Sequence, residues 1–266
     1  MRRLASFVAI ASRFALFAVV ATAGVAHADR FGTIERVRAS VVAVGTYERT
    51  RSPQFQFAGT GFVVGDGTLV VTNAHVIPPL LDVGRGEMIA IMVPNRIKDG
   101  KEEAQLQIRE GKPLAIDSSS DLAIMKITGP ALPALRLRDS ESIREGQEVL
   151  FTGFPIGAVL GPYPATHRGM VAAVTPIAIP QGRAGDLDPR VVRRLTSGSF
   201  PVLQLDATAY PGSSGSPVYD PETGDVVGII NMVLVKGTKE SALSQPSGIT
   251  YAVPSRHLQS LLDKSR

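Results

Sequence analysis

Three side chains in this sequence could together turn a serine hydroxyl into a nucleophile. They are His75 in "TLVVTNAHV", Asp121 directly before "LAIMKI", and Ser214 in "GSSGSP". A serine hydroxyl attacks poorly near neutral pH, so it needs an imidazole to take its proton and a carboxylate to orient that imidazole and stabilise its charged form. Because the three residues are far apart in the sequence, this chemistry requires a fold that brings them together.

The glycines around Ser214 suit the same chemistry. Gly212 and Gly215 can lift the serine on a tight turn whose backbone N–H groups converge on one point, and such donors stabilise the oxyanion of a tetrahedral intermediate. An ordinary Gly/Ser turn between two strands is the alternative for this segment. His75 taken alone fits a half-buried residue at a strand end, and Asp121 taken alone fits an aspartate that makes a local hydrogen bond before a strand.

Asp117 is a second candidate for the carboxylate. It lies four residues before Asp121, and therefore too early to come directly before the strand "LAIMKI". We therefore favour Asp121 as the partner of His75.

The segments that must position these residues predict an all-β chain. About a dozen short apolar runs, rich in Val, Ile, Phe and Tyr, are separated by Gly, Pro, Asp and Asn. Helical patterns are confined to "GTIERVRAS", to "RVVRRLTSG" after Asp188-Pro189, and to "SRHLQSLLDKS" near the C-terminus, for which Ser255 is the expected N-cap. Many short strands with few helices indicate closed or stacked β architecture.

Residues 1–28 predict a secretory signal peptide. Three arginines lead into the apolar "FALFAVVATAGV", which is short for a membrane span and ends in Ala26-His27-Ala28; an uncleaved anchor is the alternative. Without this segment 25 basic and 24 acidic residues remain, a net charge of +1, so nucleic-acid binding is not expected. We expect an exported protein, periplasmic or secreted, with no stable membrane span and, since it has no cysteine, no disulfide.

The order of the three residues separates this chain from other serine hydrolases. Subtilisin-like enzymes run Asp, His, Ser, and α/β-hydrolases run Ser, acid, His. With its order of His, Asp, Ser and the segments "GTGFVVGDGTLVVTNAHV", "GFPIG", "LQLDATAYPGSSGSPV" and "GITYAVPS", the chain resembles the trypsin-like serine proteases of the chymotrypsin fold, and most of all the bacterial HtrA (Deg) type. The resemblance extends from about Ile34 to Leu262.

This resemblance implies two six-stranded antiparallel β-barrels with a short C-terminal helix. The protease domain would span residues 29–266, with halves at about 29–140 and 141–266. The HtrA type usually carries one or more PDZ domains after the protease, and as a departure from that pattern we expect none here. His75 would act as general base, Asp121 would orient it, and Ser214 would form the acyl-enzyme. The N–H groups of Gly212 and Ser214 would form the oxyanion hole.

The resemblance also suggests where the substrate side chain is recognised. The residues expected to line the primary pocket are Thr208, Ala209, Asn231, Met232 and Val233. No cofactor or metal is expected. Protein or peptide substrates are the expected partners, and a homo-oligomer is one expectation for the assembly.

Two further departures from the usual family pattern affect these expectations. The motif "GSSGSP" replaces the commoner G-N-S-G-G-P; a serine at 216 also occurs in glutamyl endopeptidases, but Ile230 stands where those enzymes have a glutamate-reading histidine. Residues 175–200 are longer than the usual connection, so either a regulatory loop near the cleft or a solvated insertion is expected there.

Three functions are compatible with these features. An exported serine endopeptidase is the function that we favour, because all three residue types lie in matching motifs. The alternatives are an inactive protease-fold protein that binds peptides, and a hydrolase of small esters.

Overall fold

The first six-stranded unit of the chain is a closed antiparallel barrel. The computed structural model describes residues 29–93, 97–98, 101–102, 107–155, 163–176, 200–232 and 248–265. Neighbouring strands of the first barrel follow the order β1-β2-β3-β8-β7-β4. These strands are β1 (Val41–Tyr47), β2 (Phe55–Val64), β3 (Leu69–Asn73), β4 (Met88–Val93), β7 (Gln107–Asp117) and β8 (Leu122–Ile127). The two-residue strands β5 (Ile97–Lys98) and β6 (Lys101–Glu102) pair with each other.

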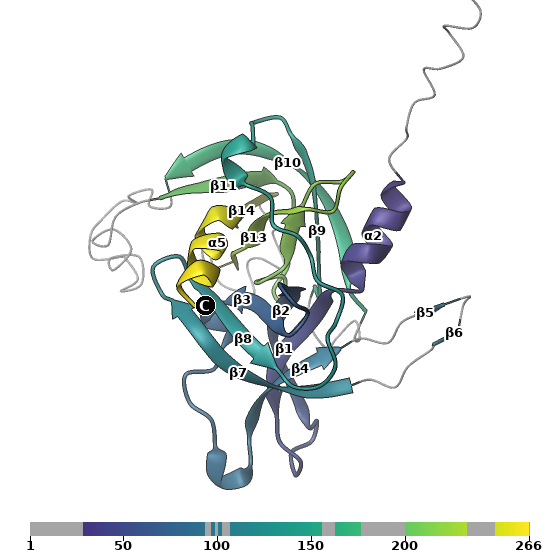
Figure 1. Cartoon of the computed structure of the whole chain (residues 1–266), viewed down its shortest axis with the longest axis vertical. Coiled ribbons are helices and arrows are strands. Elements are labelled where there is room, and N and C mark those ends of the chain that lie inside the picture. The colour runs from purple at the N-terminus through teal and green to yellow at the C-terminus, as the bar shows by residue number, and fades with distance from the viewer. Residues whose placement is uncertain are drawn as a thin grey trace, which may run out of the picture.

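The later strands close a second antiparallel barrel, in the order β10-β11-β14-β13-β12-β9. They are β9 (Glu148–Gly153), β10 (Ala165–Pro176), β11 (Pro201–Asp206), β12 (Pro217–Tyr219), β13 (Val226–Ile230) and β14 (Ile249–Pro254). Figure 1 shows the two barrels against each other, the first below and the second above. The predicted pair of six-stranded barrels is confirmed.

The barrels form because most strands are apolar on both faces. Along β1, Val42 and Val44 belong to a cluster confined to the first barrel, whereas Val41 and Ala43 belong to a cluster that both barrels share. Successive strand residues point to opposite faces, so this alternation separates the barrel interior from the contact between the barrels. A third cluster, built around residues such as Phe151 and Leu205, fills the second barrel.

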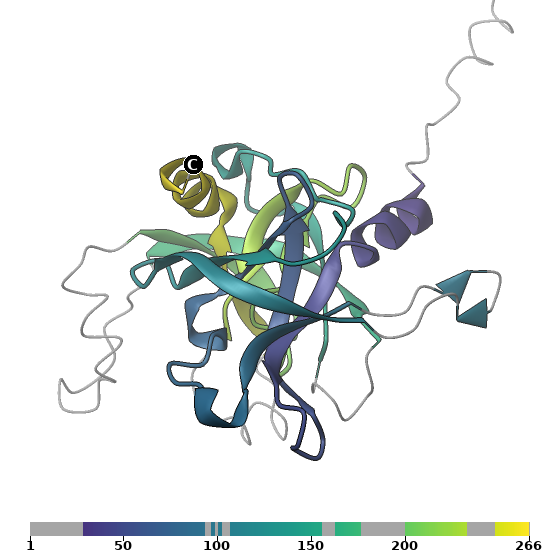
Figure 2. The ribbon, with the colours of Figure 1, turned by 60° about the horizontal axis from the view of Figure 1, so that its bottom comes forward.

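Within the described part of the chain, two α-helices lie on opposite sides of the molecule (Figures 1 and 2). Helix α2 (Arg30–Arg38) begins after Asp29, whose side chain accepts from the Gly32 amide at 3.0 Å. Helix α5 (Ser255–Lys264) follows β14 directly. Three 3-10 turns complete the described elements: η1 (Ala74–Val76), η2 (Val83–Arg85) and η3 (Ser140–Ser142). Within the described ranges, no helix has both the length and the apolar character to cross a bilayer.

The helix predictions were partly right. Helices form near "GTIERVRAS" and over "SRHLQSLLDK", but the expected N-cap role of Ser255 is wrong. Pro254 occupies the N-cap position, and the Ser255 hydroxyl instead donates to the Arg138 carbonyl at 2.6 Å, which ties the helix to the connection between the barrels. The helix expected over residues 190–198 lies outside the described residues.

Helix α5 is held by its apolar face, which gives a first testable prediction. Leu258 is fully buried in the shared cluster, whereas its neighbour Gln259 is exposed. Truncating a buried leucine removes apolar contacts and leaves a cavity, so we expect Leu258→Ala to lower the free energy of unfolding by about 2–5 kcal/mol. Urea denaturation measures this change, and Gln259→Ala is the matched control. Equal midpoints for the two variants would show that the helix does not depend on this contact.

Candidate active site

His75 and Asp121 meet because they flank two paired strands. His75 lies in η1, directly after β3, and Asp121 directly precedes β8. The two strands are antiparallel neighbours with Asn73 opposite Leu122, so the end of one strand lies beside the start of the other. This register brings together two residues that the sequence separates by a long segment.

The Asp121 carboxylate is surrounded by donors. Its Oδ2 accepts from His75 Nδ1 at 2.7 Å and from the Asn231 side-chain amide at 2.8 Å, and its Oδ1 accepts from the His75 backbone at 3.0 Å. The Asp121 carbonyl accepts from the Ala74 amide at 3.0 Å and from the Asn73 side chain at 3.1 Å. Asp121 has a φ of 57°, a left-handed conformation that is costly for a residue with a side chain. These contacts fix both its backbone and its carboxylate, which offsets that cost.

The alternative carboxylate, Asp117, has a structural role. It accepts from the Ser119 amide at 2.9 Å and from the Ser120 hydroxyl at 2.7 Å, and so organises the turn that leads to Asp121. Burial raises the pKa of Asp117, but the hydrogen bonds from Ser119 and Ser120 outweigh burial and leave the pKa below its usual value. Asp121, not Asp117, contacts His75.

Ser214 lies in a tight turn before β12, 6% exposed. Gly212 and Gly215 have φ values of 99° and 87°, which are left-handed conformations that favour glycine. Among the residues that the structure describes, none accepts a hydrogen bond from the Gly212 or Ser214 amide. The Ser214 hydroxyl accepts from the Met232 amide at 3.4 Å and makes no hydrogen bond to His75 within the described part of the chain.

The turn that carries Ser214 packs closely against the end of β9. A Cβ on Gly153, the last residue of β9, would overlap the Ser216 hydroxyl. Ser216 is fully buried, and within the described residues its hydroxyl has no hydrogen-bond partner. The serine in "GSSGSP" is therefore accommodated because residue 153 has no side chain.

The expected pocket residues occupy different environments. Ala209 is buried and its amide donates to the Thr250 hydroxyl at 3.0 Å, while Thr208 and Met232 are half-buried. Val233 lies outside the described residues. A pocket role for these residues stays a prediction.

Asn231 makes a contact that its sequence pattern did not predict. It is fully buried and its amide donates to Asp121, so it links the second barrel to the His75–Asp121 pair of the first. One sequence signal could have indicated this contact: an asparagine directly after the buried run "VVGII" needs a polar partner.

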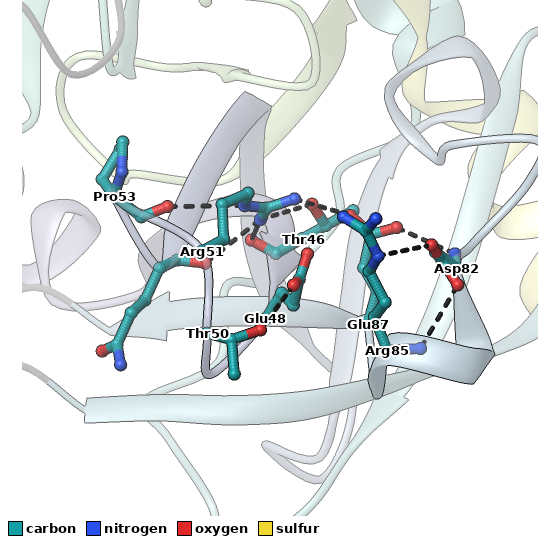
Figure 3. A network of polar contacts seen from close by, with 9 residues as sticks. Thr46, Glu48, Thr50, Arg51, Pro53, Asp82, Arg85 and Glu87 are labelled. Atoms are coloured by element: carbon teal, nitrogen blue, oxygen red, sulfur yellow. Dashed lines mark hydrogen bonds and ion pairs between the residues drawn. The ribbon is translucent and has the colours of Figure 1, made fainter.

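The loop after His75 is fastened to the β1–β2 turn by the network in Figure 3. The Arg51 guanidinium donates to Glu87 at 2.7 Å and to the Thr46 carbonyl at 2.9 Å, and Glu87 also accepts from the Asp82 amide at 3.0 Å. The Asp82 amide, the Thr46 hydroxyl and the Arg51 guanidinium lower the pKa of Glu87 to about 2. Two adjacent loops of the first barrel are thus joined by one ion pair.

The family model described as trypsin-like peptidase domain matches residues 59–229. The chain belongs to the trypsin-like peptidase family. Its trypsin-like domain is 29% identical over 206 residues to a probable periplasmic serine endoprotease, DegP-like, of Marinomonas sp. (strain MWYL1), covering 77% of this chain and 35% of the relative. It is 24% identical over 211 residues to the putative serine protease HhoB of Synechocystis sp., covering 79% of this chain and 41% of the relative. This chain therefore spans about a third to two fifths of the length of these relatives.

Solved structures show the same fold. The trypsin-like domain is similar to Deg5, with a TM-score of 0.59, 22% identity and coverage of 87% of this chain and 91% of that chain. It is also similar to the HtrA-type protease AlgW with tripeptide, with a TM-score of 0.59, 20% identity and coverage of 88% and 62%. The expected family and fold are confirmed.

The low pKa of Glu87 predicts a pH-dependent contribution to stability. Its pKa is about 2 in the folded trypsin-like domain and near 4.5 when unperturbed, so the charged form stabilises the fold above about pH 4.5 and this contribution is lost as the pH falls toward 2. We expect Glu87→Gln to lower the melting temperature at pH 7, and we expect the difference from wild type to shrink between pH 4.5 and pH 3. Glu35→Gln, on the exposed surface of α2, is the control, and a pH-independent difference for Glu87→Gln would contradict the argument.

Proposed function

We propose that this chain is an exported serine endopeptidase that cleaves peptide bonds through His75, Asp121 and Ser214. The observation that carries the proposal is the 2.7 Å contact between His75 Nδ1 and Asp121 Oδ2 in a member of the trypsin-like peptidase family. An ionised carboxylate can only accept, so the His75 proton lies on Nδ1 and Nε2 is left as a proton acceptor. This is the tautomer that a general base requires.

We assign the acylation step to these groups. The Ser214 Oγ attacks the carbonyl carbon of the scissile bond as its proton passes to His75 Nε2. The carbonyl oxygen gains the negative charge and is stabilised by the Gly212 and Ser214 amides. When the tetrahedral intermediate collapses, the C–N bond breaks and His75 gives its proton to the departing amine.

Deacylation repeats these two steps with water as the nucleophile. His75 Nε2 takes a proton from water as its oxygen attacks the ester carbonyl, and the second intermediate releases the acid and returns the proton to Ser214. Asp121 stabilises the positive imidazole in both halves. Asn231 donates to the same carboxylate oxygen and so holds Asp121 in place.

One movement must precede the reaction. The Ser214 hydroxyl contacts the Met232 amide at 3.4 Å, so it must rotate toward His75 Nε2. Catalytic hydrogen bonds are often formed only when substrate binds, so we expect the hydrogen bond between Ser214 and His75 to form in the substrate complex. The same observation favours a second candidate function, peptide binding without hydrolysis, which the first experiment below separates from catalysis.

The N-terminal segment and a relative support the proposed setting of the reaction. A basic, apolar and small-residue leader over residues 1–28 supports export, and the Marinomonas relative is described as periplasmic. We infer that the substrates are proteins or peptides in the periplasm or outside the cell.

The nucleophile is tested with a fluorophosphonate probe on the mature protein. We expect wild type to be labelled on the peptide that contains Ser214, and Ser214→Ala to lose both labelling and turnover, the latter by several orders of magnitude. Ser213→Ala is the matched control, because Ser213 is the adjacent serine of the same turn and should not be labelled in any variant. Wild type that binds peptides without labelling would instead indicate the inactive peptide-binding protein.

The primary specificity is tested with a peptide library. Positions 208 and 209 carry threonine and alanine, so neither offers a carboxylate to a Lys or Arg of the substrate. Ile230 replaces the histidine by which glutamyl endopeptidases recognise glutamate, so a charged substrate side chain would lack a partner in the pocket. We expect small or medium aliphatic residues before the scissile bond. Ser214→Ala, assayed in parallel, identifies cleavage by contaminating proteases. A profile dominated by Arg, Lys or Glu would refute this expectation.

A further inference from the structure

Thr60, in β2 of the first barrel, contacts the turn that carries Ser214 in the second. It is fully buried and, among the described residues, makes the following hydrogen bonds. Its amide donates to the Ser214 carbonyl at 2.9 Å, and its hydroxyl donates to the Gly212 carbonyl at 2.8 Å. The hydroxyl also accepts from the Phe154 amide at 3.0 Å, and the Thr60 carbonyl accepts from the Thr72 hydroxyl at 2.7 Å.

The direction of the Thr60 hydroxyl is fixed by its neighbours. The Phe154 amide can only donate, so it occupies a lone pair of the hydroxyl oxygen, and the single hydroxyl proton is left for the Gly212 carbonyl. Gly153 and Gly215 leave room for this contact, since a Cβ on Gly215 would overlap the Thr60 carbonyl and one on Gly153 would lie 2.9 Å from the Thr60 hydroxyl. The contact is therefore specific in both direction and position.

These two contacts fix the peptide groups on either side of an oxyanion donor. The Gly212 carbonyl belongs to the 212–213 peptide and the Ser214 carbonyl to the 214–215 peptide, and Thr60 binds both. The peptide between them carries the Ser214 N–H. Gly212 has a φ of 99°, a conformation that glycine adopts readily, and this torsion together with the fixed 212–213 peptide constrains the direction of the Gly212 N–H.

We propose that Thr60 is a positioning residue for the oxyanion hole, acting from the first barrel on the Gly212 and Ser214 amides of the second. This inference rests on the proposed function, in which those amides stabilise the negative oxygen of the intermediate. A preorganised donor is effective because it does not reorient during the reaction. Loss of the Thr60 hydroxyl therefore affects turnover more than substrate binding.

The test compares variants that keep or remove the hydroxyl. Thr60→Val keeps the shape of the side chain and removes the hydroxyl, Thr60→Ser keeps the hydroxyl, and Thr60→Ala serves if valine prevents folding. Thr152→Val is the control for losing a buried hydroxyl, because Thr152 is equally buried but bonds to Thr166 and Tyr219 rather than to the 212–215 turn. Steady-state kinetics on a peptide substrate are measured beside hydrogen exchange of residues 210–217.

We expect Thr60→Val to lower kcat by about tenfold or more with KM changed less than about threefold, since removal of one oxyanion donor outright costs about 100- to 1000-fold. Thr60→Ser should restore most of kcat, and the 210–217 segment should exchange faster only in the variants that lack the Thr60 hydroxyl. Equal kcat and equal exchange in Thr60→Val and Thr152→Val would overturn the inference. Wild type without turnover would contradict the proposed function alone, because hydrogen exchange still measures whether Thr60 holds the turn.

Discussion

The apolar contact between the two barrels is the constraint on which the site depends. Phe62 and Leu122 of the first barrel belong to the same buried cluster as Tyr219 and Ile229 of the second. Polar contacts such as Asn231 to Asp121 and Thr60 to Gly212 cross this same boundary, and each tolerates only a few tenths of an ångström of displacement. A close-packed interior resists such displacement. The apolar packing between the barrels therefore keeps the donors and acceptors of these hydrogen bonds at the right distance from each other.

The polar groups around Ser214 are not all satisfied. Donors and acceptors are matched at Asp121 and Thr60, but within the described residues the buried hydroxyls of Ser213 and Ser216 lack partners. A buried polar group without a partner costs about 1–3 kcal/mol. These two hydroxyls lie on either side of Ser214, so the polar groups of this turn are less completely paired than those around Asp121 and Thr60.

The strand pattern of the sequence predicted closed or stacked β architecture, because such patterns are local signals. The two six-stranded barrels and the pairing of His75 with Asp121 were implied by the family resemblance of the motifs. The sequence did not predict the contacts of Asn231 or Thr60, since these depend on how segments more than 100 residues apart are aligned. The prediction for Ser255 failed for a different reason. A serine before an apolar helical face resembles an N-cap, but the Ser255 hydroxyl donates a hydrogen bond to the Arg138 carbonyl instead. A local sequence pattern does not indicate which distant group will form a hydrogen bond with a given side chain.

Gly153 and Ser216 show how such packing restricts the evolution of the chain. A Cβ at residue 153 would overlap the Ser216 hydroxyl and would lie 2.9 Å from the Thr60 hydroxyl. Replacing Ser216 by glycine would relieve the first of these contacts and leave the second. An alanine at 153 therefore costs less in a chain that already carries glycine at 216 than in this one. The effect of one substitution thus depends on the other, and the order in which they arise affects the stability of the intermediate.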